Sequence, residues 1–186
     1  MITNKKVIAH FESIQSSLED QWKQRLSKKD PFTHVWIVRS DSEIEKIPDD
    51  FIRMMFASDN GKEDFSEIIK AYVTDNHPQG IIFCMEAWVA KDINEDLLPR
   101  SYHTAKNKAE AISRCMTDAG GARSFGSLYG RAVEIICLTV EDDEGGSFGV
   151  MYDIQKDGSL VIDNAFKDVG FKTYGKFANL FNPEKS

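Results

Sequence analysis

The segment 80–89 constrains the fold most, because it is apolar at both odd and even positions. It reads Gly-Ile-Ile-Phe-Cys-Met-Glu-Ala-Trp-Val. Successive side chains of a strand point to opposite faces, so this pattern predicts a central strand that is covered on both sides. A chain of 186 residues, 41% hydrophobic and 28% charged, has the size and composition of one globular domain. We therefore predict a single domain over residues 1–186.

The N-terminal segment predicts a long amphipathic helix. Its apolar residues recur at steps of three and four, which places them on one face: Val7, Ile8, Phe11, Ile14, Leu18, Trp22 and Leu26. Shorter amphipathic helices are predicted around 51–55 and over 65–73. Another is predicted after Thr104, which is suited to cap it. The glycine- and serine-rich stretch 119–130 predicts a mobile loop.

Strand patterns dominate the second half of the chain. Alternating or continuous apolar residues, many of them β-branched or aromatic, predict strands at 34–39, 132–140, 148–154 and 160–162. Turn residues at 142–146 and 156–158 have the chemistry of hairpins, and short connections favour antiparallel pairing. The fold predicted is α+β, a mainly antiparallel sheet of about five strands with amphipathic helices packed on one face. For 172–181 the sequence leaves a helix and an edge strand both open.

Charge and cysteine content limit the partners and the compartment. The net charge of −7 disfavours binding to a phosphate backbone, so nucleic acid is not the expected main partner. The three cysteines are odd in number and far apart in sequence, which favours reduced, buried thiols and a cytoplasmic location: Cys84, Cys115 and Cys137. No apolar run predicts a secretory signal or a membrane span. A monomer and a dimer both fit the sequence.

Two catalytic motifs are approximated but incomplete. Gly145 to Gly149 has the spacing of a nucleophile elbow, yet a strand rather than a helix follows its serine, and no histidine follows His103. Gly121 and Gly126 have the spacing of a phosphate loop but lack its lysine. Neither motif predicts an activity.

Two carboxylates in apolar strands are the main candidates for chemistry. Glu86 lies within the central strand, where a charge is costly unless it is paired or neutralised. It either forms an ion pair with Arg39 or Arg131 or serves as a functional acid with a raised pKa. Glu134 lies in the strand at 132–140.

Glu86 and Glu134 could act together if their strands are neighbours. With His103 they would then form an acid–base or metal centre. Carboxylate ligands suit Mg²⁺ or Mn²⁺ better than Zn²⁺. The opposing interpretation is that both carboxylates are structural and that the protein has no cofactor.

The segment 123–131 mixes arginine, aromatic residues and glycine. Such a mixture fits either a phosphate or single-strand contact or an ordinary surface loop. The candidate binding residues are the two arginines of this segment and the tryptophan of the central strand: Arg123, Arg131 and Trp88.

Several short motifs follow one another along the chain. Glu86-Ala87-Trp88 precedes the segment from Pro99 to His103, which is followed by Arg131-Ala132-Val133-Glu134 and then by a hairpin. This order resembles a family of small uncharacterised bacterial and phage proteins. In the family pattern the Pro/His segment leads almost directly into the Arg-x-x-Glu strand, whereas here 104–130 intervenes. The family has no established activity, so the resemblance only marks five positions to be tested together: Glu86, Trp88, His103, Arg131 and Glu134.

Two functions from different classes follow from the sequence. The first is a non-enzymatic accessory or protein-binding module of a bacterium or phage, which the lack of a complete catalytic motif favours. The alternative is a small metal-dependent hydrolase or nuclease that uses Glu86 and Glu134.

Overall fold

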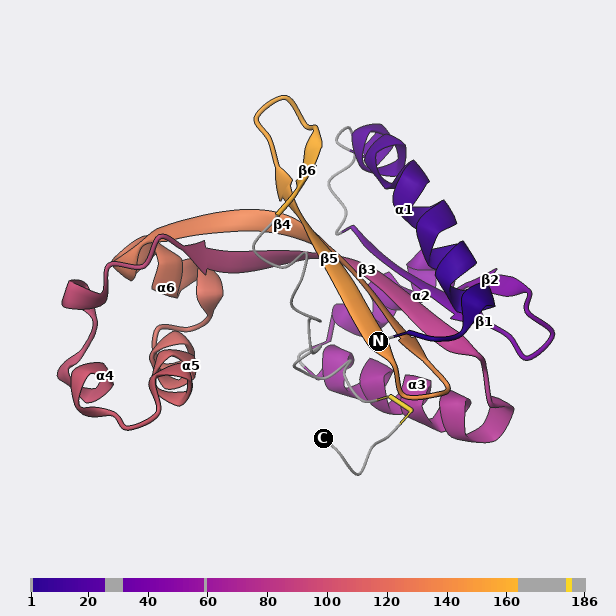
Figure 1. Cartoon of the computed structure of the whole chain (residues 1–186), viewed down its shortest axis with the longest axis horizontal. Helices are drawn as coiled ribbons and strands as arrows, with labels where there is room; N and C mark the ends of the chain where they lie inside the picture. Colours follow the sequence, from indigo (N-terminus) through magenta and orange to yellow (C-terminus); the bar gives the residue numbers. More distant parts are fainter. Residues whose placement is uncertain (1, 26–31, 59, 164–179, 182–186) are drawn as a thin grey trace. The chain divides into compact units, whose positions relative to one another are not determined.

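The computed structural model describes residues 2–25, 32–58, 60–163 and 180–181. Its helices are α1 (Lys5–Arg25), α2 (Asp49–Phe56), α3 (Gly61–Asn76), η1 (Glu95–Leu97), α4 (Arg100–Thr104), α5 (Lys108–Asp118) and α6 (Ala122–Tyr129) (Figure 1). Its strands are β1 (Thr33–Val38), β2 (Ile44–Lys46), β3 (Gly80–Lys91), β4 (Arg131–Asp142), β5 (Ser147–Ile154) and β6 (Leu160–Ile162). The predicted α+β class is confirmed. The segment 172–181 lies outside the described residues except at its last two positions.

The strands form one antiparallel sheet in the order β2-β1-β3-β4-β5-β6. Both expected hairpins are present, and Gly145 and Gly158 take positive φ angles of 78° and 81° in their turns. The strand that the sequence did not predict is β2, which pairs Trp36 with Lys46 and Val38 with Ile44. It has only three residues, and two of them are charged, so its sequence shows no strand pattern.

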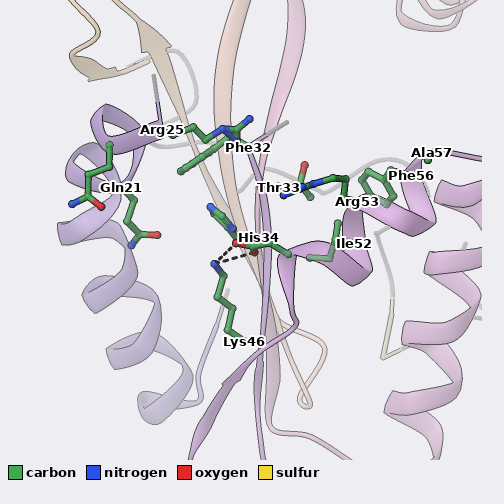
Figure 2. Close-up of a pocket in the computed structure, with 12 residues that line it drawn as sticks. Gln21, Arg25, Phe32, Thr33, His34, Lys46, Ile52, Arg53, Phe56 and Ala57 are labelled. Atoms are coloured by element: carbon green, nitrogen blue, oxygen red, sulfur yellow. Dashed lines mark hydrogen bonds and ion pairs between the residues drawn. The ribbon is translucent and has the colours of Figure 1, made fainter. Parts of the chain in front are cut away.

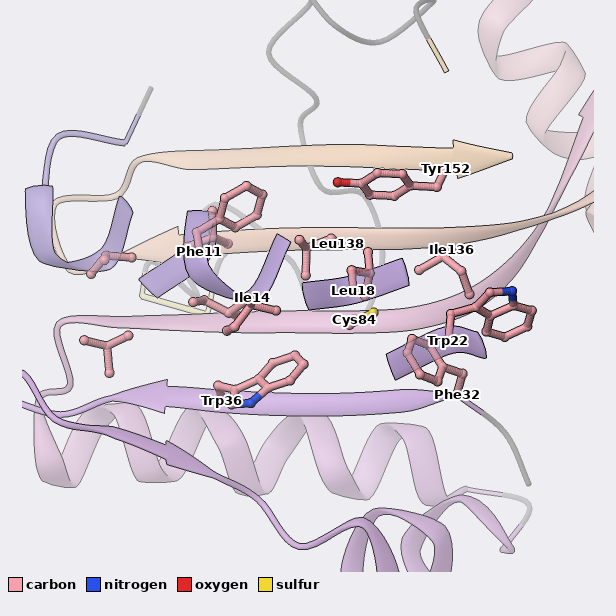
Figure 3. Packing of buried hydrophobic residues seen from close by; sticks show 14 of the residues in the cluster. Phe11, Ile14, Leu18, Trp22, Phe32, Trp36, Cys84, Ile136, Leu138 and Tyr152 are labelled. Atoms are coloured by element: carbon pink, nitrogen blue, oxygen red, sulfur yellow. The ribbon is translucent and has the colours of Figure 1, made fainter. Parts of the chain in front are cut away.

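Helices cover both faces of the sheet, so the prediction of one covered face is wrong. The apolar stripe of α1 packs on one face, against side chains of β1, β3, β4 and β5 that include Leu138 and Cys84 (Figure 3). The opposite face packs against α2 and α3 through Val35, Ile81 and Phe83. The doubly apolar pattern of 80–89 has its physical reason here, because alternate residues of β3 enter two separate cores.

The chain divides into two compact units. Unit 1 comprises residues 1–86 and 136–186, and unit 2 comprises 87–135. The core of unit 2 is built around the ring of Phe125, with Leu98, Tyr102, Ala111 and Cys115 buried beside it. Of the helices in the described ranges, none is long and apolar enough to cross a membrane.

Two local predictions in unit 2 are wrong. Thr104 ends α4 instead of capping the next helix, and the cap of α5 is Asn107, whose side chain accepts a hydrogen bond from the backbone N–H of Glu110 at 3.2 Å. The predicted loop at 119–130 contains α6. Its glycines suggested a loop, but the burial of Phe125 and Gly126 stabilises a helix there.

Candidate functional site

A pocket of about 490 Å³ lies in unit 1 between α1, the start of β1, β2 and α2 (Figure 2). It exists because β2 is short: β2 pairs with β1 only from Trp36 to Val38 and does not continue beside Thr33 and His34. Its volume is in the range of small-molecule sites.

Helix periodicity brings the lining side chains together. On α2, the residues Asp49, Ile52, Arg53 and Phe56 recur at steps of three and four, so they share one face. On α1, the same spacing directs Gln21, Gln24 and Arg25 into the pocket. Both helices therefore contribute donors for hydrogen bonds, and α2 adds an apolar wall.

The polar part of the lining is basic, although the chain carries a net charge of −7. Arg25, Lys46 and Arg53 line the pocket, and Asp49 is the one carboxylate among the residues that line it. A local cluster of positive charge in an acidic protein favours an anion at that point.

Asp49 connects an imidazole and an ammonium group. Its Oδ1 lies 2.9 Å from Nδ1 of His34, and both of its oxygens lie 3.0 Å from Nζ of Lys46. The side chain of His34 is 12% exposed and that of Asp49 is 45% exposed. The imidazole is therefore fixed at Nδ1 while the carboxylate remains partly hydrated.

Aromatic neighbours hold the ring of His34 as well. The ring centroid lies 4.6 Å from that of Phe32, which it meets edge to face, and 5.6 Å from that of Trp36. Figure 2 shows the imidazole projecting from β1 toward α1. Packing and a hydrogen bond thus preorganise the ring, as a binding or catalytic imidazole requires.

Burial and hydrogen bonding shift the two acid–base groups. Burial lowers the pKa of His34, and the hydrogen bond that its ring donates to Asp49 offsets only part of this effect. Burial acts to raise the pKa of Asp49, but hydrogen bonds from His34 and Lys46 outweigh it and the pKa is lowered. At neutral pH, Asp49 is therefore ionised and His34 is neutral, with the proton on Nδ1 and a lone pair on Nε2.

The two candidate carboxylates belong to different units. Glu86 is half-buried in the unit 1 part of β3, where its backbone N–H donates to the carbonyl of Phe32 at 3.1 Å. Glu134 is exposed on β4 within unit 2. Arg39, considered as a partner of Glu86, instead pairs with Asp41 at 3.2 Å.

Two of the candidate binding residues meet within unit 2. The guanidinium of Arg123 lies 4.5 Å from the ring centroid of Trp88, so the two side chains form a cation–π contact. Arg131 pairs with Asp92 at 3.1 Å. His103 is exposed on α4 with its ring edge-on to Tyr102, 5.4 Å between centroids.

No group of three or more His, Cys, Asp or Glu side chains that could hold a metal ion occurs among the residues that the structure describes. The pocket of unit 1 offers one imidazole and one carboxylate, and a lysine ammonium competes for that carboxylate. This donor set suits an anion better than a divalent cation.

Sequence reasoning missed His34, Lys46 and Asp49. One signal was available, since His34 is the one ionisable residue of β1 and is followed by Val-Trp-Ile-Val. Nothing local relates it to Asp49 fifteen residues later.

Comparison of the chain with family models, with curated proteins and with solved structures found no match.

Proposed function

We propose that the protein is a non-enzymatic binding module whose unit 1 binds a small anionic ligand in the pocket between α1 and α2. The observation that carries the proposal is the concentration of Arg25, Lys46 and Arg53 around a pocket of about 490 Å³ in a chain of net charge −7. Arginine is well suited to hold an oxyanion, because its planar donors match two oxygens at once.

The mixed lining of the pocket defines the ligand further. The basic groups and the amides of Gln21 and Gln24 line it together with the apolar side chains of Phe32, Ile52 and Phe56. A ligand that combines an oxyanion with an apolar or aromatic body would satisfy both kinds of lining. A bacterial or phage origin and a protein partner that responds to this ligand stay part of the proposal.

Thermal unfolding with added anions tests the proposal. A ligand that binds only the folded state stabilises it by about 2.7 kcal/mol at a hundred times its Kd. We expect sulfate, inorganic phosphate or phenyl phosphate to raise Tm more than sodium chloride does at equal ionic strength. Phenyl phosphate should be the most effective of the three because it also contacts the apolar side chains of the lining.

Two variants on α1 distinguish anion binding in the pocket from a general effect of the charge of the protein. Arg25→Gln removes a lining charge, whereas Lys23→Gln removes the same charge from an exposed side chain that pairs with Glu19. We expect Arg25→Gln to raise the Kd for phenyl phosphate about tenfold and Lys23→Gln to leave it within about twofold. Equal effects of the two substitutions would refute the assignment of the pocket.

The alternative, a metal-dependent hydrolase or nuclease that uses Glu86 and Glu134, has a different signature. It requires Mg²⁺ or Mn²⁺ to raise Tm in the wild type but not in Glu86→Gln. The anion proposal expects neither metal to shift Tm through Glu86.

A further inference from the structure

We infer that the pocket takes an oxyanion group with two negative charges, of the phosphate or sulfate type, and that binding this group adds a proton to Nε2 of His34. The inference rests on the proposed function, since it names the ligand class and the proton coupling of the same pocket. It follows from the position of one imidazole between a fixed carboxylate and a basic lining.

The hydrogen bond to Asp49 determines which ring nitrogen of His34 can take a second proton. Nδ1 of His34 is occupied by Asp49 at 2.9 Å, so any second proton on the ring must be carried by Nε2. The ring is 12% exposed and packs against Phe32 and Trp36, which removes most of the water that would stabilise an imidazolium.

Before an anion binds, the charged neighbours of His34 also oppose protonation of its ring. Lys46 and Arg25 face the ring with positive charge, and their electrostatic effect disfavours the imidazolium. Asp49 favours it, but Lys46 contacts both oxygens of that carboxylate and offsets much of its charge. Arg53 of α2 adds a third positive charge to the lining, which Asp50 partly offsets at 3.5 Å. On β3, the residue paired with His34 is Cys84, whose pKa is raised by burial so that the thiol is neutral.

Binding of the anion changes the charge around the ring of His34. A doubly charged oxyanion beside Arg25 makes the surroundings of His34 negative instead of positive. The imidazolium then becomes the favoured form and donates Nε2–H to an anion oxygen. Asp49 holds the ring in the orientation that this requires. A singly charged carboxylate would give a smaller effect, which is why the site discriminates by ligand charge.

Thermodynamic reciprocity gives the inference a measurable form. If the anion raises the affinity of His34 for a proton, then the proton raises the affinity for the anion by the same factor. Sulfate is the probe, because it keeps both charges throughout the pH range of the experiment and any proton taken up must go to the protein.

The experiment follows the imidazole Cε1–H signals of the four histidines by NMR against pH, with sodium sulfate or with sodium chloride at equal ionic strength. The signal of His34 is assigned from its loss in His34→Gln. We expect saturating sulfate to raise the pKa of His34 by about one unit or more, and the sulfate Kd to increase about tenfold between about pH 6 and about pH 8.

Asp49→Asn supplies a second, independent readout, with Glu45→Gln on the exposed part of β2 as its matched control. Loss of the carboxylate should weaken sulfate binding about tenfold at about pH 6 and hardly at all at about pH 8, where His34 is neutral. Glu45→Gln should retain the wild-type pH profile.

The outcomes separate the two proposals. If sulfate binds in the pocket but the pKa of His34 and the Kd do not depend on each other, the proton coupling is refuted and the anion site stands. If sulfate shifts neither the His34 signal nor Tm at any pH, the anion site and the coupling fall together.

Discussion

His34 is the one ionisable side chain of β1, and it is followed there by four apolar residues. A buried imidazole with one nitrogen hydrogen-bonded to a carboxylate has a defined tautomer and orientation. In enzymes the same pairing prepares a base, whereas the anion binding proposed for this protein rests on the arginines and the lysine around the pair. The difference lies in the neighbours of the pair rather than in the pair itself.

At the residue scale, Asp142 is the most deeply buried acidic side chain of the described part of the chain. Its oxygens accept hydrogen bonds from the backbone N–H groups of Gly146 at 2.6 Å and of Thr3 at 3.1 Å. One carboxylate therefore holds the β4–β5 turn and the segment that precedes α1.

Asp142→Ala should lower the free energy of unfolding by about 1–3 kcal/mol, because the backbone N–H groups of Gly146 and Thr3 lose their acceptor and the first of these hydrogen bonds is buried. The neighbouring exposed carboxylate is the control, and Asp143→Ala should change stability by less than about 0.5 kcal/mol. Urea unfolding monitored by circular dichroism measures both. Equal losses in the two variants would show that the buried contacts of Asp142 contribute nothing.

At the element scale, α6 shows how packing overrides a local signal. The helix contains Gly126, a poor helix former, and begins after Gly121, which has a φ angle of 112°. Gly126 is required where α6 passes β4: a Cβ atom there would lie 2.9 Å from both the N and the Cα of Ala132. These are backbone atoms, so they cannot rotate away.

Gly126→Ala should therefore destabilise unit 2 by about 1–3 kcal/mol, although alanine has the higher helix propensity by about 1 kcal/mol. Ser124→Ala, at an exposed position of the same helix, should instead stabilise it by a few tenths of a kcal/mol, as helix propensity alone predicts. Thermal unfolding of the two variants should give shifts of opposite sign. A higher Tm for Gly126→Ala would contradict the close approach of the helix to the strand.

At the scale of the whole molecule, three apolar cores share no residue. Two of them lie on opposite faces of the sheet in unit 1, and the third lies wholly within unit 2. Regions with separate cores can open separately, with different free energies. Unit 1 contains the proposed anion site, so its stability need not follow that of unit 2.

Phe125→Ala tests this separation, because Phe125 is fully buried in the core of unit 2. It should lower the free energy of opening of unit 2 by about 3–5 kcal/mol. Native-state hydrogen exchange should show faster exchange in α5 and α6 and unchanged exchange in α1. Leu128→Ala, at a position of α6 that is 61% exposed, is the control and should leave all three helices unchanged. Equal acceleration in α1 would mean that the units unfold together.

The sequence by itself determined the elements whose signal is local and periodic. The stripe from Val7 to Trp22, the doubly apolar segment 80–89 and the turn residues of the two hairpins each specify which side chains face a core. The α+β class follows from their order, because short connections between strands give antiparallel pairing.

Only the tertiary structure decided the rest, and the physical reason is that a site depends on distances that no local pattern encodes. His34, Lys46 and Asp49 come from β1, β2 and α2, and nothing local in these three segments relates one residue to another. Glu86 stood out because a charge in an apolar run is locally visible, whereas a basic pocket arises from charges that are scattered in sequence. Likewise, α6 is a helix because Phe125 and Gly126 are buried, which its local composition did not reveal.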